Sequence, residues 1–255
     1  MMKRFFVIAL FVLGYGQLYA RPVRDTAGTK AGYFGLKLTQ VSLSSWSAGG
    51  ESALAFDSQI TYSADFKRDR QLWQNRLELG YGLTKNDGKS ARKTNDKIYF
   101  ASTYGYQIYK TLYWSALLNF NTQFAKGYDY NIEDSDFISK FMAPGYLMIG
   151  TGVTWSPNKI FTATFTPASW RGTIVADSRL ADEGAFGVDK GKHLLSEFGA
   201  NLKAEVNYEF LPNMKVYSRL ELYSNYLEDP QNVDVRWEVQ LNMAINKWFS
   251  TTLST

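Results

Sequence analysis

Residues 197–210 read E-F-G-A-N-L-K-A-E-V-N-Y-E-F, and the two faces of this segment differ in chemistry. Successive side chains of an extended chain point to opposite faces. One face carries Phe198, Ala200, Leu202, Ala204, Val206, Tyr208 and Phe210, and the other carries Glu197, Asn201, Lys203, Glu205, Asn207 and Glu209. The alternation outlasts a soluble strand of about five or six residues and fits a tilted membrane-crossing strand of about nine to eleven.

The same alternation recurs from about Leu54 to about Leu253, for example over residues 54–66, 97–109 and 112–124. Strands with lipid on one side and water or ion pairs on the other show this pattern. A soluble secreted β-protein with one solvated face is the alternative. The length and repetition of the segments favour an all-β, transmembrane, antiparallel up-and-down β-barrel.

The N-terminus has the organisation of a secretory signal peptide. Lys3 and Arg4 precede the apolar residues 5–13, and Ala20 is a small residue before a plausible cleavage point. Nine apolar residues are too few for a membrane anchor, which needs about 20. We therefore expect a signal peptide over residues 1–20 and a barrel over residues 21–255.

Composition excludes several classes of protein. The absence of cysteine excludes disulfides, thiolate metal sites and a lipid-modified N-terminal cysteine. Loss of Lys3 and Arg4 with the signal lowers the formal net charge from +4 to +2, which gives no argument for nucleic acid. No mature run of 18 apolar residues exists to form a transmembrane helix. The aromatic content of 16% suits the two girdles of a membrane barrel.

The expected connections alternate between short and long, as in outer-membrane barrels. Short turns are expected at residues 67–70, 110–111, 156–159, 211–213 and 246–247, and long loops at 85–96, 125–145 and 177–194. Residues 228–232 form an exception, because they make a short connection on the long side. Counting residues 33–43 as the first strand, although this segment could instead enter the lumen or lie at the rim, gives ten complete strands and an eleventh from Trp248. Bacterial barrels close with an even number, so we expect about twelve strands in the parent protein, the last of them missing from this chain.

The inward face of these strands carries charges of both signs. We expect them to form a lumen charge network that holds the register and largely fills the bore. A substrate-selective passage lined by the same residues is the alternative. The network comprises Asp57, Asp65, Arg76, Glu78, Lys97, Glu197, Lys203, Glu205, Glu209, Lys215, Arg219, Glu221, Arg236 and Glu238.

Residues for catalysis or metal binding are scarce, and we expect no enzyme activity, cofactor or metal. The single histidine, His193, lies in a predicted loop beside Lys190 and Lys192, without a nucleophile motif. Residues 85–97 carry five basic and two acidic side chains, which could touch lipopolysaccharide phosphates or remain solvated. Residues 128–136 hold four acidic side chains but lack the spacing and glycine of a calcium loop.

Several motifs resemble one protein family. They are W-S-A-G-G-E-S from Trp46, K-T-N-D-K from Lys93, S-A-L-L-N-F-N-T-Q-F-A-K-G-Y-D-Y from Ser115, A-D-E-G-A-F-G-V-D from Ala181, and S-N-Y-L-E-D-P-Q-N-V-D-V-R-W-E from Ser224. From about Trp46 to Thr255 the chain resembles Bacteroidota outer-membrane β-barrel proteins catalogued as a domain of unknown function, DUF3078. The resemblance implies an outer-membrane barrel and carries no catalytic or binding residues.

Three functions are compatible with these features. The first is a non-enzymatic barrel of the Gram-negative outer membrane with a structural, assembly or partner-scaffold role. Its partners would be outer-membrane lipid, lipopolysaccharide and other outer-membrane proteins. The second is a narrow, porin-like transport pore for small solutes. The third, a membrane-embedded lipid hydrolase, would depend on His193 or on an unrecognised carboxylate pair.

Overall fold

The computed structural model describes residues 16–25, 28–42, 51–132, 136–244 and 249–254. Within these ranges strands dominate, and one short α-helix and one 3-10 turn interrupt them. The elements are β1 Gly16–Asp25, β2 Gly28–Val41, β3 Ala53–Arg68, β4 Gln71–Asn86, β5 Arg92–Tyr109, β6 Leu112–Thr122, β7 Gly127–Tyr128, β8 Phe137–Ser139, β9 Gly145–Trp155, β10 Phe161–Ile174, α1 Ser178–Asp182, η1 Ala185–Gly187, β11 Leu194–Leu211, β12 Met214–Asn225, β13 Val233–Ala244 and β14 Ser250–Ser254.

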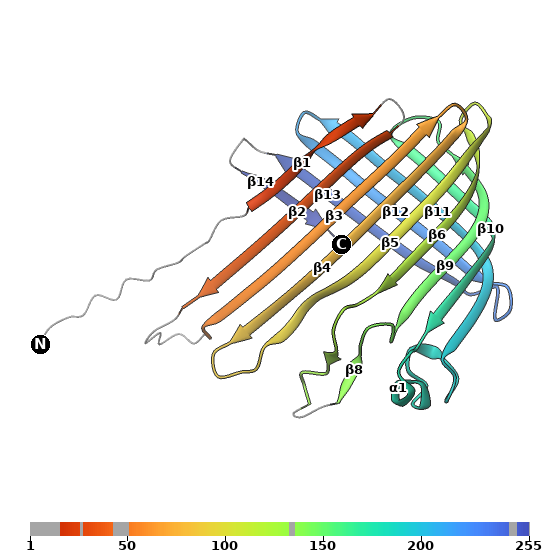
Figure 1. Ribbon diagram of the computed structural model, residues 1–255. Helices are drawn as coiled ribbons and strands as arrows, with labels where there is room; N and C mark the ends of the chain where they lie inside the picture. Colours follow the sequence, from red (N-terminus) through yellow and green to blue (C-terminus); the bar gives the residue numbers. More distant parts are fainter. Residues whose placement is uncertain (1–15, 26–27, 43–50, 133–135, 245–248, 255) are drawn as a thin grey trace, which may run out of the picture.

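One twelve-stranded sheet contains every strand except β7 and β8, which form a separate hairpin. Strands follow one another across the sheet in chain order, and each recorded pairing is antiparallel. In Figure 1 the strands from β1 to β6 lie in front of those from β10 to β13, so the long sheet curves back on itself. The all-β, antiparallel, up-and-down part of the prediction is confirmed.

The ten predicted complete strands are β2 to β6 and β9 to β13, and β14 starts close to the predicted eleventh. β2 begins earlier than expected, at Gly28, and β1 was not predicted. β1 pairs with β2 from Gly16 opposite Leu36 to Asp25 opposite Gly28. It therefore lies across the predicted cleavage point after Ala20.

The two ends of the sheet differ in their connections. Figure 1 shows tight turns at one end, and β8 and α1 at the other. The tight turns contain Asp69, Lys110 and Asn213, each with positive φ, as two-residue turns between antiparallel strands require. The long loops at 125–145 and 177–194 are confirmed by β7–β8 and by α1–η1.

The predicted long loop at residues 85–96 is wrong. β4 continues to Asn86 and β5 begins at Arg92, so only residues 87–91 connect them. The polar run K-T-N-D-K stays in the ladder because its charges find partners there: Lys93 Nζ lies 2.6 Å from Asp96 Oδ2 and 2.9 Å from the Ala125 carbonyl. Polarity alone misidentified this strand end as a loop.

The buried apolar core lies at the long-loop end, outside the sheet. Its members are Ala143, Val175, Leu180, Ala181 and Val188, with Phe137, Ala185, Phe186 and Leu195 packed against them. We call residues 137–144 and 175–193 the cap. Among the described residues, no helix is long and apolar enough to span a membrane.

Candidate functional site

The strand register places every residue of the predicted charge network on one face of the sheet. Glu78 stands opposite Tyr99, and Tyr99 opposite Asn121. The row continues through Tyr146 and Thr173 to β11, whose Glu205 faces Arg219 of β12. We call this the inner face, and the opposite one, which carries Leu77 and Trp237, the outer face.

One ion-pair cluster on the inner face centres on Glu78 of β4. Its carboxylate lies 2.5 Å from Arg76 Nε and 2.5 Å from Lys97 Nζ of β5. One acidic group thus joins two cations on neighbouring strands. Such cross-strand pairs fix the register, since a slip of one residue would send these charges to the outer face.

A second cluster spans β11, β12 and β13. Glu205 lies 3.4 Å from Lys203 and 3.4 Å from Arg219, and Arg219 reaches Glu238 at 3.7 Å. The Tyr217 hydroxyl donates to Glu205 at 3.0 Å. Nearer the tight turn, Glu209 pairs with Lys215 at 3.4 Å.

The remaining predicted residues differ in their partners. Asp57 accepts a hydrogen bond from Asn95 at 3.1 Å, and Glu221 accepts one from Asn201 at 3.0 Å. Within the described ranges, no ion pair or side-chain hydrogen bond is recorded for Asp65 or Arg236.

Sequence reasoning missed the centre of a third cluster, Arg171 of β10. Its guanidinium lies 3.1 Å from Asp234, 3.9 Å from Glu197 and 3.4 Å from the centre of the Tyr223 ring. A bulge between Thr166 and Ser169 shifts the alternation of β10 by one residue, so Arg171 turns inward. Pro167 within that bulge is the available signal, because proline is confined to bulges and edges of sheets.

A cavity of about 560 Å³ opens beside this third cluster. Strands from β5 to β13 line the cavity. It therefore brings together Tyr99 of β5 and Arg236 of β13, although five strands of the sheet lie between β5 and β13. Phe186 of the cap and Leu195 of β11 line the same cavity and pack against the apolar core. The cap therefore covers part of this interior.

Local sequence signals explain how the cap folds. Asp177 caps the N-terminus of α1, because its Oδ1 accepts the Leu180 backbone N–H at 3.0 Å. Gly184 ends the helix with φ of 74° and Gly187 turns the chain again with φ of 83°, conformations that favour glycine. These two glycines give a short loop the turns it needs to fold over its own apolar side chains.

An ion pair locks the two halves of the cap together. Lys140 Nζ lies 2.5 Å from Asp177 Oδ2. The Lys140 ammonium, and then the Leu180 backbone N–H, hold the pKa of the Asp177 carboxyl below its usual value. The negative charge of Asp177 is thus stabilised in the folded cap.

A comparison with known protein families gives a match over the N-terminal strands of the sheet. Residues 38–128 match the family described as "Protein of unknown function (DUF3078)". The DUF3078 match runs from the last residues of β2 through β3–β6 to β7, and so contains the Glu78 cluster. The motifs beginning at Ala181 and Ser224 lie beyond the matched range. Comparisons with the curated proteins and with the solved structures found no match.

The basic segment of the DUF3078 region is more compensated than its sequence suggests. Lys89 pairs with Glu51 at 2.7 Å and lowers the pKa of that carboxyl, and Lys93 pairs with Asp96. Arg92 stacks on the Tyr130 ring at 5.3 Å. The predicted contact with lipopolysaccharide phosphates remains a prediction.

The other predicted loop sites show little chemistry. Residues 133–135 of the acidic loop lie outside the described residues, and within the described ranges no group of three or more His, Cys, Asp or Glu side chains could hold a metal. His193 Nδ1 lies 2.7 Å from the Val175 carbonyl oxygen. That contact ties the ring to the backbone of the cap.

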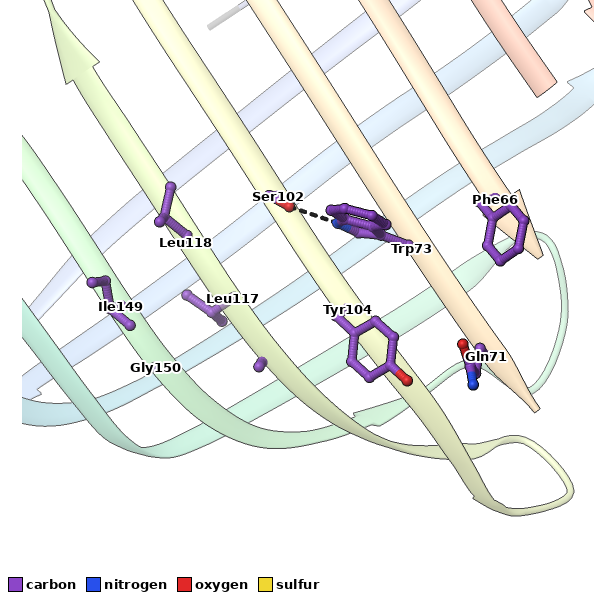
Figure 2. Close-up of a pocket in the computed structure, with 10 residues that line it drawn as sticks. Phe66, Gln71, Trp73, Ser102, Tyr104, Leu117, Leu118, Ile149 and Gly150 are labelled. Atoms are coloured by element: carbon purple, nitrogen blue, oxygen red, sulfur yellow. Dashed lines mark hydrogen bonds between the residues drawn. The ribbon is translucent and has the colours of Figure 1, made fainter. Parts of the chain in front are cut away.

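The outer face carries a shallow apolar hollow. Figure 2 shows Phe66, Trp73, Tyr104, Leu118 and Ile149 side by side along its wall, contributed by β3, β4, β5, β6 and β9. Trp73, Ser102 and Asn75 form a hydrogen-bond chain beside this hollow: Trp73 Nε1 donates to Ser102 Oγ at 2.9 Å, and Ser102 Oγ donates to Asn75 Oδ1 at 2.8 Å.

Proposed function

We propose that the protein is a non-enzymatic β-barrel of the outer membrane of a Gram-negative bacterium. In this proposal its interior is filled by ion-paired side chains and the cap, and it serves as a structural, assembly or scaffold component. The observation that carries the proposal is the inverted burial of the sheet, which exposes apolar side chains and buries polar ones.

The inversion is clearest on the outer face, and on the inner face the burial of polar groups is greatest on β10. On the outer face Leu54, Ile149 and Trp237 are 48%, 46% and 67% exposed. On the inner face Thr166 and Ser169 are completely buried. A water-soluble monomer rarely exposes a continuous apolar surface of this extent, whereas lipid acyl chains would cover it. The apolar hollow near Trp73 would then hold acyl chain.

Three of the five outer-face tryptophans in the described residues give independent support, whereas no indole hydrogen bond is recorded for Trp114 or Trp155. Trp73, Trp170 and Trp237 each donate their indole N–H to a serine of a neighbouring strand, Ser102, Ser196 and Ser218, at 2.9, 2.6 and 3.0 Å. In hydrocarbon no water can satisfy an indole N–H, so an internal acceptor is required. On a water-exposed surface, solvent could accept the indole hydrogen bonds, and the serines would not be required as acceptors.

Closure of the sheet into a barrel is part of the proposal. The cavity lined from β5 to β13 supports a sheet that wraps around its inner face. A closed barrel would leave no lipid-exposed backbone edge, which a membrane does not tolerate. Closure would join the β1 edge of the sheet to the β14 edge.

Heat-modifiable gel migration tests the barrel. A folded membrane barrel resists detergent denaturation at room temperature and should migrate differently before and after boiling. Recovery of the protein with outer-membrane fractions should accompany the shift. The absence of the heat-dependent shift would overturn the barrel and favour a soluble β-protein.

A narrow pore is the second candidate, and the interior cavity is the observation that favours it. Planar-bilayer recordings of the reconstituted protein distinguish the two. The charge-paired clusters and the cap predict a silent membrane, whereas stable ion-selective openings would support the pore.

The non-enzymatic part of the proposal rests on the placement of His193. Its Nδ1 contacts a backbone carbonyl rather than a nucleophile. Phospholipid hydrolysis by the purified protein would contradict this part, and loss of that hydrolysis in His193→Ala would identify the base.

A further inference from the structure

The interior cavity has two facing walls of polar side chains. Tyr99, Asn121, Tyr146 and Thr173 stand opposite one another in a row across β5, β6, β9 and β10. Arg236 of β13 belongs to the other wall, beside Glu221. Phe186 of the cap adds an apolar surface.

Most charges of this cavity are already neutralised. Arg171 is shared between Asp234 and Glu197, as described above. Arg219 is shared between Glu205 and Glu238. These groups hold the walls together and have little capacity left for a ligand.

Arg236 differs from the other two arginines. Glu221 stands opposite it in the ladder, but the Glu221 carboxylate accepts from Asn201 at 3.0 Å, and no oxygen within ion-pair distance of Arg236 is recorded in the described part of the chain. The hydroxyls of Tyr99 and Tyr146 and the amide of Asn121 likewise have no recorded side-chain hydrogen bond within those residues. Within the described residues Arg236 and Glu221 thus face the cavity without an ion pair, and only Arg236 and the neutral donors still lack a recorded side-chain hydrogen bond.

We propose that this cavity binds a small organic oxyanion, a carboxylate or phosphate group on a hydroxyl-bearing solute. Arg236 provides the charged hydrogen bonds, because a guanidinium presents paired donors that match an oxyanion. Tyr99 and Tyr146 provide neutral donors, and Asn121 both donates to and accepts from the solute's hydroxyls. The cavity volume lies within the range of about 300–1,000 Å³ that is usual for small-molecule sites.

The location of this site rests on the proposed barrel, in whose interior it lies. The binding experiment uses the full chain, folded in detergent, and titration calorimetry with three probes. Gluconate presents a carboxylate with hydroxyls, inorganic phosphate presents an oxyanion alone, and glucose presents hydroxyls alone. We expect gluconate to bind best, phosphate more weakly, and glucose not measurably.

Two variants and one control locate the binding. Arg236→Gln should weaken gluconate at least about tenfold, because it removes a charge-assisted interaction. Tyr146→Phe should weaken it about two- to tenfold. Arg68→Gln, at the tight-turn end with a side chain 74% exposed, should bind like the unaltered protein.

The proposal is overturned if no anion binds, if glucose binds as well as gluconate, or if Arg236→Gln binds like Arg68→Gln. Heat-modifiable migration of each variant shows that it is folded. A heat-modifiable protein that ignores anions would overturn the binding site alone, whereas failure of heat modification in the unaltered chain would overturn the barrel.

Discussion

The cap buries its apolar side chains against one another, whereas the sheet turns them outward. Leu180 in the cap is 2% exposed, and Leu54 of the sheet is 48% exposed. In the proposed barrel the same chain would fold against two solvents: the cap would fold as a piece of a water-soluble protein does, and the outer face of the sheet would contact lipid. Substitutions of matched residues in the two regions test this difference.

The largest effect is expected for Leu180→Ala in the cap. Loss of a buried leucine leaves a cavity and should destabilise the cap by about 2–5 kcal/mol. Hydrogen exchange of the Val188 and Gly191 amides would measure it. Leu54→Ala, on the outer face, should cost less than about 1.5 kcal/mol because no cavity forms there. Equal costs at the two leucines would contradict the comparison.

Leu202→Arg tests the outer face directly. In a bilayer an arginine near the hydrocarbon centre should destabilise the fold by about 2–4 kcal/mol, measured by urea unfolding in phospholipid vesicles. The adjacent inner-face change Lys203→Arg keeps its charge and should be nearly neutral. A change below about 0.5 kcal/mol for Leu202→Arg is the result for a surface in water, and it would contradict a lipid-facing sheet.

Two substitutions of Asp177 distinguish its capping hydrogen bond to the Leu180 backbone N–H from its ion pair with Lys140. Asp177→Ala loses both the cap and the Lys140 ion pair and should cost about 0.5–2 kcal/mol, whereas Asp177→Asn keeps the helix cap and should cost less. Amide exchange across α1 measures both.

The pH dependence of the cap follows from the lowered pKa of Asp177. The stabilisation is fully present above the ordinary carboxyl pKa of about 3.9 and is lost as pH falls through the lower pKa of the folded state. Acid should therefore loosen the cap of the unaltered protein more than that of Asp177→Asn. The same acid sensitivity in both would assign it to another group.

The smallest effect is expected for Ser102→Ala, which removes the acceptor of the Trp73 indole. In lipid the unpaired N–H should cost about 0.5–1.5 kcal/mol, and in a water-exposed sheet almost nothing, since water replaces the serine. Urea titration in vesicles measures it, with Ser63→Ala on the inner face of β3 as the control. Identical unfolding midpoints would remove the tryptophan argument for lipid.

The sequence was sufficient to predict the strands and the inner-face charges because both follow from a period of two. Asp57 through Glu238 share one face for this reason alone. Partners across a tight turn, such as Glu209 and Lys215, also follow from the sequence, since the turn fixes their register. The residues of the Glu78 cluster lie on the neighbouring strands β4 and β5, so their proximity also follows from the sequence.

Distant partners could not be predicted in this way. Arg171 and Asp234 are 63 positions apart in sequence and meet because β10, β11, β12 and β13 align in a register that a bulge has shifted. The cavity could not be predicted either, because it forms only when the whole sheet curves and brings β5 close to β13. The sequence predicts the cap only as two loops, because its packing depends on contacts between Ala143 and Val175 from separate segments.

The pairing of β1 with β2 has a consequence for the order of maturation. Cleavage after Ala20 would remove the half of β1 that pairs with residues 32–36 of β2 and leave only residues 21–25 on that edge. The backbone donors and acceptors of β2 would then become available to a new strand. Removal of the signal peptide would thus not only release the chain. It would also expose the β2 edge, at which the proposed barrel could close.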